Sequence, residues 1–159
     1  MSDLNTLLVN IRNAIYDYGD LQTWCTSNYS RNHKVYVGLD TRNPPGQSDY
    51  PMVAIFPWKQ SQGYGKMEQR HEFEIVVGLY DTALRAVAGK SGIIEKNGIQ
   101  NLEAMRALVS LAIQGADIDD NWLNDLDTEY DPVEYFPFFL GSSIYKLSTP
   151  YYQGDDPLL

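Results

Sequence analysis

The chain has 159 residues, which is enough for one domain whose core needs neither disulfides nor a structural metal. Its formal net charge is −9. Residues 117–159 hold the whole imbalance, with ten acidic residues and one basic residue, against eleven of each in residues 1–116. Nucleic-acid-binding proteins need clustered lysine and arginine, so this distribution argues against specific nucleic-acid binding.

The cysteine content and the hydropathy of the chain indicate the cellular compartment in which the protein is made. The single cysteine, Cys25, cannot form an internal disulfide and fits a reducing compartment. The N-terminal residues lack the basic and apolar parts of a signal peptide, and no apolar run approaches the length of a membrane span. We therefore expect a soluble protein made in the cytoplasm, with no membrane partner. Twelve tyrosines favour contact surfaces as well as core.

A helix is predicted over residues 4–18. Its apolar residues recur at intervals of 3, 1, 3, 4 and 3, which places them on one stripe, and Gly19 follows as a stop. The stripe consists of Leu4, Leu7, Leu8, Ile11, Ile15 and Tyr18. Residues 21–32 are polar and turn-like, with Trp24 as a packing anchor. The β-rich residues 34–39 predict a first strand.

The strongest strand signal lies in residues 70–81. Apolar residues on one side of a period-2 pattern alternate with a mixed set on the other, which is typical of a strand with one face on a core. The first set is Phe73, Ile75, Val77 and Leu79, and the second is Glu72, Glu74, Val76, Gly78 and Tyr80. Upstream, residues 51–58 are a short apolar run whose ends Pro51 and Pro57 mark. A polar loop with two glycines joins these runs, which predicts a long-looped antiparallel hairpin.

The second half of the chain begins with an irregular segment. Residues 82–98 contain three glycines and predict an exposed excursion. A second helix is then predicted over residues 99–113, capped by Asn97 and stopped by Gly115. Its apolar residues cover more than one stripe, so the helix packs on two neighbours, one of which can be another subunit. The candidate interface residues are Met105, Leu108, Val109 and Leu111.

The C-terminal part predicts one more strand. Residues 117–131 are acidic, with a short helical turn around Trp122 and Leu126, and residues 142–148 form the last strand. The elements follow in the order α-β-β-β-α-β. We expect an α+β fold in a single domain over residues 1–159. Its small antiparallel-rich sheet has about four strands, and its two main helices lie on one face.

A phosphate-loop motif is incomplete in this chain. Gly89, Lys90 and Ser91 follow a strand and resemble the end of such a loop. The loop also needs a glycine five residues before its Gly-Lys pair, where Leu84 stands. An ordinary glycine-rich loop is therefore the preferred interpretation.

A calcium-loop motif is also incomplete. Asp117, Asp119 and Asn121 have the required 1-3-5 spacing, but Trp122 and Thr128 stand where the loop needs glycine and glutamate. A solvated acidic surface explains these residues as well. We expect no cofactor and no metal site.

An enzymatic alternative rests on Glu72 and Glu74. They lie two residues apart on one strand face, as in some metal-dependent nucleases and hydrolases, and His71 is adjacent. Such an enzyme also needs a lysine, a further acid and a basic DNA track, and none of these can be placed. His33 is the other histidine, and a catalytic histidine pair is less common than two structural histidines. We therefore expect no catalytic residue.

The hairpin carries a resemblance to a known family. Residues 50–55 read Tyr-Pro-Met-Val-Ala-Ile, and after a polar loop residues 72–81 read Glu-Phe-Glu-Ile-Val-Val-Gly-Leu-Tyr-Asp. This pattern resembles the tail terminator proteins of long-tailed phages of the lambda type, also called tail completion or minor tail proteins. In that family an N-terminal amphipathic helix precedes the hairpin, and a helix and a late strand follow it. Residues 4–18, 99–113 and 142–148 match these elements in order.

The resemblance implies a non-enzymatic structural protein of a phage or prophage. Such proteins assemble as a ring, typically a homohexamer, on the head-proximal end of the tail tube. There they stop tube growth and present a surface to the head–tail connector protein. The implied partners are thus other copies of the chain, the tail tube protein and the connector. The implied locations are the host bacterial cytoplasm during assembly and then the virion tail.

Two segments depart from the family pattern. Residues 82–98 and 117–139 are longer than expected. They are either added interaction surfaces or the mark of a neighbouring branch, such as head–tail joining proteins of the same fold. A non-viral interaction module of this fold is a further alternative, because a fold does not determine a function.

The acidic segment suggests a role in such a ring. A ring at the end of the tail tube must let DNA pass without binding it, and carboxylates repel phosphates over a Debye length of about 8 Å at physiological salt. We therefore predict that part of residues 117–134 faces the channel. The residues concerned are Asp117, Asp119, Asp120 and Asp125. A solvated outer surface is the alternative.

Overall fold

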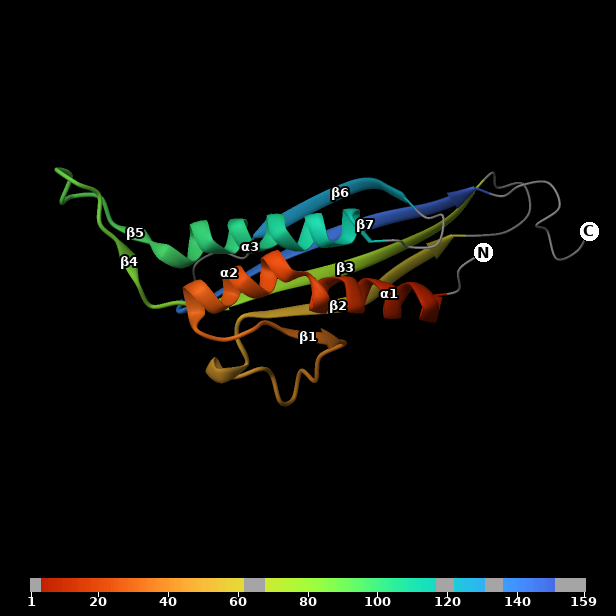
Figure 1. The fold of residues 1–159 in the computed structure, drawn as a ribbon, viewed down its shortest axis with the longest axis horizontal. Coiled ribbons are helices and arrows are strands. Elements are labelled where there is room, and N and C mark those ends of the chain that lie inside the picture. The colour runs from red at the N-terminus through yellow and green to blue at the C-terminus, as the bar shows by residue number, and fades with distance from the viewer. Residues whose placement is uncertain (1–3, 62–67, 117–121, 131–135, 151–159) are drawn as a thin grey trace, which may run out of the picture.

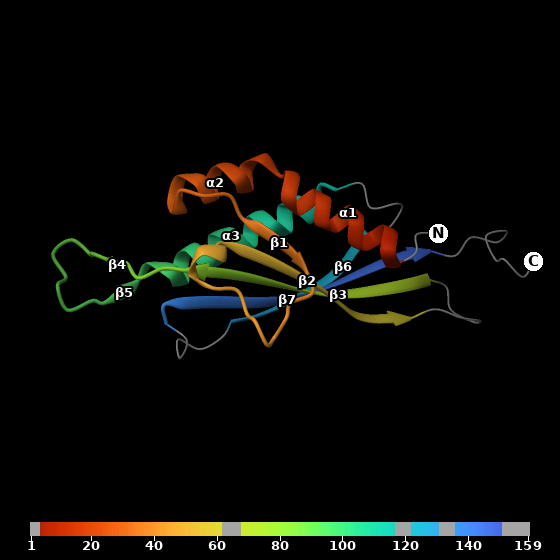
Figure 2. The ribbon, with the colours of Figure 1, turned by 90° about the horizontal axis from the view of Figure 1, so that it is seen from below.

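Three helices cover one face of a five-stranded sheet, and a small hairpin extends from one end of the molecule (Figures 1 and 2). The computed structural model describes residues 4–61, 68–116, 122–130 and 136–150. The elements are α1 (Leu4–Asp17), α2 (Gly19–Tyr29), β1 (Lys34–Val37), the 3-10 helix η1 (Gln47–Asp49), β2 (Met52–Ser61), β3 (Glu68–Tyr80), β4 (Leu84–Arg85), β5 (Glu95–Lys96), α3 (Asn97–Gln114), β6 (Trp122–Tyr130) and β7 (Phe138–Pro150). The predicted α+β class is confirmed, but the predicted order α-β-β-β-α-β is wrong, because a third helix, α2, and the strands β4, β5 and β6 are also present. The large sheet has five strands where about four were predicted.

The large sheet has the strand order β1-β2-β3-β7-β6. The short strand β1 runs parallel to β2, and the other three neighbouring pairs are antiparallel. β3 occupies the centre, pairing Val77 with Val53 of β2 and Ile75 with Ser143 of β7. The predicted hairpin of β2 and β3 is therefore present.

The core lies between the sheet and the helices, and β3 supplies its base. The four alternating apolar residues predicted to face inward are all buried: Phe73, Ile75, Val77 and Leu79. Val53 and Ile55 of β2 and Tyr145 and Leu147 of β7 extend the same apolar face on either side. The alternation in β3 therefore predicted the buried face correctly, because a strand with one face on a core must alternate.

The helices place their apolar stripes on this face of the sheet. In α1, Leu7, Ile11 and Ile15 are buried at helical spacing, as predicted. The expectation of an irregular segment over residues 21–32 was wrong, because α2 begins at Gly19 and continues to Tyr29. Only Leu21 and Cys25 of α2 are buried. A helix that buries so little lacks the long apolar stripe by which a sequence reveals a helix.

Helix α3 corrects part of the predicted subunit interface. Met105 and Val109 are buried in the core of this chain, so neither can present a surface to another subunit. Leu108 is half-buried against the same core, whereas Leu111 has 52% of its surface exposed. Asn97, predicted as the cap, is the first residue of the helix and Lys96 precedes it as N-cap.

Three strands differ from their predicted limits. Pro57 does not end β2 but lies within it, where the pairing with β3 shifts between Pro57 and Lys59. The predicted helical turn around Trp122 and Leu126 is wrong, because both residues belong to β6. β7 is longer than predicted and pairs with β3 along its whole length. None of the helices in the described ranges is long and apolar enough to cross a membrane.

A close contact between a glycine and an aromatic ring fixes α3 on the sheet. A Cβ atom at Gly98 would lie 2.3 Å from Cδ2 and Cε2 of Phe139, which is far inside van der Waals contact. Phe139 belongs to the core cluster and lies opposite Leu79 in the β3–β7 pair. The first turn of α3 can therefore approach the sheet only because residue 98 has no side chain.

We predict that Gly98→Ala lowers the free energy of unfolding by about 1–3 kcal/mol, because the added methyl group overlaps Phe139. Denaturant unfolding measures this change. Gly19→Ala is the matched control, since nothing lies within 4 Å of a Cβ atom there and α2 accepts alanine. Equal stability of Gly98→Ala and the parent protein would contradict the packing described here.

Candidate functional site: an exposed arm and its base

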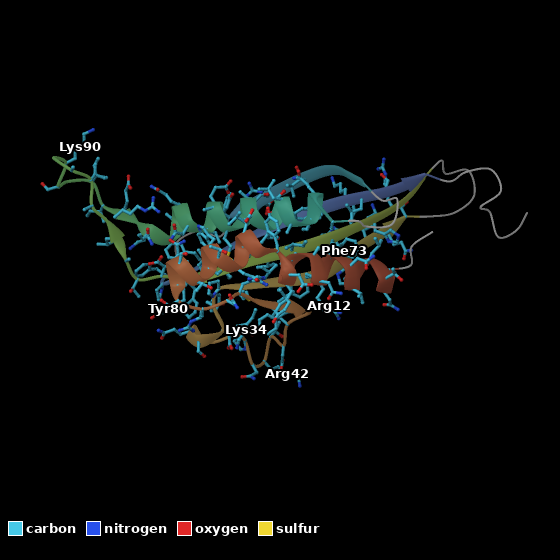
Figure 3. The ribbon with its side chains drawn as sticks, in the orientation of Figure 1. Arg12, Lys34, Arg42, Phe73, Tyr80 and Lys90 are labelled. Atoms are coloured by element: carbon cyan, nitrogen blue, oxygen red, sulfur yellow. The ribbon has the colours of Figure 1, made fainter. Side chains whose placement is uncertain are left out.

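The most exposed apolar part of the described chain is the hairpin of β4 and β5 with its connecting turns, residues 82–96, which we call the arm. Its two short strands pair Leu84 with Lys96 and Arg85 with Glu95. Two successive turns order its tip, closed by hydrogen bonds from the Lys90 amide to the Val87 carbonyl and from the Ile93 amide to the Lys90 carbonyl. Figures 1 and 2 show the arm extending beyond the helices and the sheet, and Figure 3 shows Lys90 at its far end. The sequence predicted an exposed excursion here, and the structure adds that it is a hairpin.

The arm carries large apolar side chains that the described part of the chain leaves exposed. Leu84 has 59% and Ile94 has 77% of its surface exposed, and Ile93 is also exposed. Ile99, one turn into α3, is exposed beside the base of the arm. Contiguous exposed apolar residues mark surfaces that bind other molecules, because leaving them in water is unfavourable. The arm is therefore the strongest candidate for a binding surface.

A buried carboxylate holds the base of the arm. Asp81, directly after β3, accepts hydrogen bonds from the hydroxyl of Tyr29 at 2.8 Å and from the side-chain amide of Asn97 at 2.7 Å. It also accepts one from the backbone amide of Ala83 at 2.8 Å. These donors come from α2, α3 and the first residues of the arm. Burial and the neighbouring carboxylate raise the pKa of Tyr29, which keeps its hydroxyl protonated as a donor.

Arg85 extends this network from the arm onto α3. Its Nε donates to Oδ1 of Asn97 at 2.8 Å, its Nη2 donates to Oδ1 of Asn101 at 3.0 Å, and its Nη1 contacts Gln100. Asn101 in turn donates to the hydroxyl of Tyr29 at 3.0 Å, which closes the network. The planar guanidinium group fixes several acceptors at once, so the arm leaves the body in one direction.

A second surface with exposed apolar residues lies along α3 and β6. Leu111 is exposed on α3, with Ala107 and Leu108 half-buried beside it. Tyr130, the last residue of β6, is 49% exposed, and its hydroxyl donates to the carboxylate of Glu103. We call these five residues the α3–β6 surface. Arg106 also binds Glu103 and lowers the pKa of that carboxyl group.

The sheet face opposite the helices is partly covered by the chain itself. Tyr50 and Tyr80 each contact the ring of Phe138, with centroids 5.1 and 5.2 Å apart. Gly78 lies beneath this group, since a Cβ atom there would lie 2.7 Å from the Tyr50 ring. The mixed second side of β3 therefore packs on aromatic rings at this end, and it leaves less apolar surface free than the sequence suggests.

The residues of the enzymatic alternative do not meet at one site. His71 is fully buried with Phe73 on the helix-covered face, whereas Glu72 and Glu74 alternate to the opposite face. Burial lowers the pKa of His71, so it is uncharged at neutral pH. Across the described ranges, no group of three or more histidine, cysteine or acidic residues could hold a metal ion.

The remaining candidates have structural explanations or lie outside the described ranges. The ring of His33 is buried and forms a hydrogen bond with the Ile15 carbonyl, and burial raises the pKa of the Cys25 thiol to about 12. Gly89 has a positive φ of 73° in the tip of the arm, where it serves a turn. The predicted channel residues Asp117, Asp119 and Asp120 lie outside the described ranges, and for Asp125 only the backbone in β6 is described.

Sequence reasoning missed the network at the base of the arm. One sequence feature could have indicated it: Asn97, Gln100 and Asn101 are polar residues at helical spacing. They share one face at the start of an otherwise apolar helix. Nothing in the local sequence shows that Tyr29 and Asp81, 52 positions apart, meet there.

Comparison with known proteins adds no relative. No protein-family model matches the chain, and no curated protein matches it. A proposal of function is therefore based on the geometry described above and on the sequence pattern.

We predict that Asp81→Ala destabilises the protein by about 1–3 kcal/mol, because it leaves three donors without their acceptor. The loss is concentrated at the arm, so the backbone amide of Asn97, which donates to the Ala83 carbonyl, exchanges its hydrogen faster. Denaturant unfolding and hydrogen exchange measure the two effects. Thr82→Ala, at an exposed neighbouring position, is the control and changes neither. Unchanged exchange at Asn97 in Asp81→Ala would show that the network does not hold the arm.

Proposed function

We propose that this chain is a non-enzymatic structural protein of a phage or prophage that forms a homo-oligomeric ring, typically a hexamer. The ring caps the tail tube, ends its polymerisation and joins the tail to the head–tail connector. The observation that supports this most is the arm, because its exposed apolar side chains suit a protein that acts by assembly. The tail terminator assignment in particular rests on the resemblance of residues 50–55 and 72–81 to that family.

The arrangement of polar groups fits the same proposal. The hydrogen-bond network around the buried Asp81 holds an exposed arm in place. The tightest contacts, at Gly98 and Gly78, serve packing of the helices and aromatic rings on the sheet. Rigid placement of contact surfaces is what a ring subunit needs, because several copies must meet at the same angle for the ring to close.

The acidic segment has a role in this proposal. Asp117, Asp119, Asp120 and Asp125 face the channel and repel the phosphates of passing DNA. The concentration of acid in residues 117–159 supports this role, and so does the exposure of Asp127 and Glu129 on β6.

The assembly proposal predicts that the protein forms a discrete oligomer and binds tube ends. Native mass spectrometry over a range of concentrations reads out the subunit number, and electron microscopy of tail tubes with added protein shows where it binds. We expect a single ring at one end of each tube and an arrest of further growth. Binding to isolated connectors with none to tubes would favour the head–tail joining alternative. A strict monomer that binds neither would refute both.

The channel proposal predicts the effect of charge reversal at Asp119, Asp120 and Asp125. Replacing the three with lysine leaves ring assembly intact, slows DNA ejection and creates an affinity for DNA that falls as salt rises. Ejection assays and DNA binding at several salt concentrations measure these effects. Changing Asp17, Asp20 and Asp40 to lysine is the matched control, since all three are exposed on other parts of the chain. Normal ejection by the first triple variant would refute the channel position.

A further inference from the structure

We infer that the arm of one copy packs on the α3–β6 surface of a second copy, in a head-to-tail contact that repeats around the assembly. The inference specifies which surfaces meet. It needs the self-association that the proposed function also requires, but it does not depend on a tail tube.

The arm needs a partner from outside its own chain. Figures 1 and 2 show the arm beyond the end of the helices and the sheet, and its residues Leu84 and Ile94 are exposed. The network of Asp81 and Arg85 fixes the base of the arm, so the arm does not fold back onto the body. Since no described part of the chain covers these residues, we place their apolar partner on a second molecule.

The α3–β6 surface has the extent and chemistry to receive the arm. From Glu103 to Leu111 it extends eight residues along α3, which is about 12 Å at 1.5 Å per residue. Ala107 and Leu108 between them leave a low apolar surface with no charge at its centre, on which branched side chains can pack. Leu111 and Tyr130 are themselves exposed and lose contact with water when the arm covers them.

The arm and the rest of the chain carry net charges of opposite sign. Residues 82–96 contain three basic residues and one acidic residue, a net charge of +2, which leaves −11 for the rest of the chain. Lys90 is the only charged residue in the tip between Arg85 and Glu95. The receiving surface carries one charged residue, Glu103, which Arg106 binds. The acidic residues Asp127 and Glu129 of β6 alternate to the sheet face opposite the helices, so they add to the negative charge of the body and not to the receiving surface. A basic arm on an acidic body steers one copy towards another with the arm leading, whereas two bodies repel each other.

The geometry makes this contact heterologous. The arm leaves one end of the molecule, whereas the α3–β6 surface lies along its side (Figure 1). The two halves of the contact are therefore different surfaces, so each copy offers one free arm and one free receiving surface. Repeated contacts of this kind close into a ring when the rotation between copies permits. A two-fold contact between identical surfaces would instead stop at a dimer.

Two single variants test the two surfaces of the proposed contact, the arm and the α3–β6 surface. Ile94→Asp places a charge on the arm, and Leu111→Asp places one on the receiving surface. Each weakens self-association by more than about tenfold, because the interface would bury an unpaired charge. Val9→Asp, an exposed apolar residue of α1, is the matched control and assembles like the parent. Circular dichroism and thermal unfolding confirm that all three fold, and light scattering reads their mass.

Mixing the two variants gives the sharper test. The arm of the Leu111→Asp chain is unaltered, and so is the receiving surface of the Ile94→Asp chain. One arm contact can therefore form between the two variants. We expect a one-to-one heterodimer in native mass spectrometry and no larger assembly. A mixture of two chains that both carry Ile94→Asp stays monomeric.

A covalent trap checks the contact directly. Ile94→Cys combined with Leu111→Cys yields a ladder of disulfide-linked chains on mild oxidation, whereas each single cysteine variant yields at most a dimer. Cys25 does not interfere, because it is buried in the core.

The possible results separate this inference from the proposed function. If Ile94→Asp assembles like the parent, or if the mixed variants form no heterodimer, the arm contact is refuted while a terminator ring using other surfaces can stand. If assembly depends on both residues but the oligomer binds no tube end, the arm contact holds and the terminator proposal fails. A parent protein that stays monomeric at every concentration refutes the inference outright.

Discussion

The burial of one face of β3 is the constraint on which the rest of the structure depends. This strand pairs with β2 on one side and β7 on the other, and its residues from Phe73 to Leu79 form the base of the core. All three helices must lie on that face to cover it. The opposite face is left to a mixed set of polar and apolar residues, such as Glu74 and Val76, and to the aromatic group around Phe138. The placement of α3 also brings its first turn to the end of β3, where the arm begins.

The base of the arm uses hydrogen bonds where the body uses apolar packing. Apolar contacts are non-directional and allow small rotations, whereas the donors and acceptors around Asp81 and Arg85 are satisfied only within narrow distances and angles. Removing one partner leaves the others unsatisfied, so the network opposes intermediate positions of the arm. A projection that must present side chains at one angle benefits from this kind of anchor.

The sequence predicted the parts of the fold whose pattern is local and complete. The alternation in β3 and the stripe of α1 each contain enough residues to identify the element and its buried face, whereas the apolar run of α3 identifies the helix only. α2 and β6 were missed because α2 buries only Leu21 and Cys25, and the acidic residues of β6 conceal its strand character. Met105 and Val109 were assigned to a subunit contact because a sequence does not show how many neighbours a helix has within its own chain. The network at Asp81 joins residues from four separate elements, so no local pattern contains it.

The position of Pro57 bears on how the protein avoids uncontrolled aggregation. β1 ends at Val37 opposite Ile55, so in the described sheet the rest of β2 is an open edge to which a strand of another molecule could add. Pro57 has no amide hydrogen to offer such a strand, the pairing shift between Pro57 and Lys59 bends the edge, and Lys59 adds an exposed charge. Strand addition is thereby disfavoured at this edge, which opposes extension of the sheet from one copy to the next.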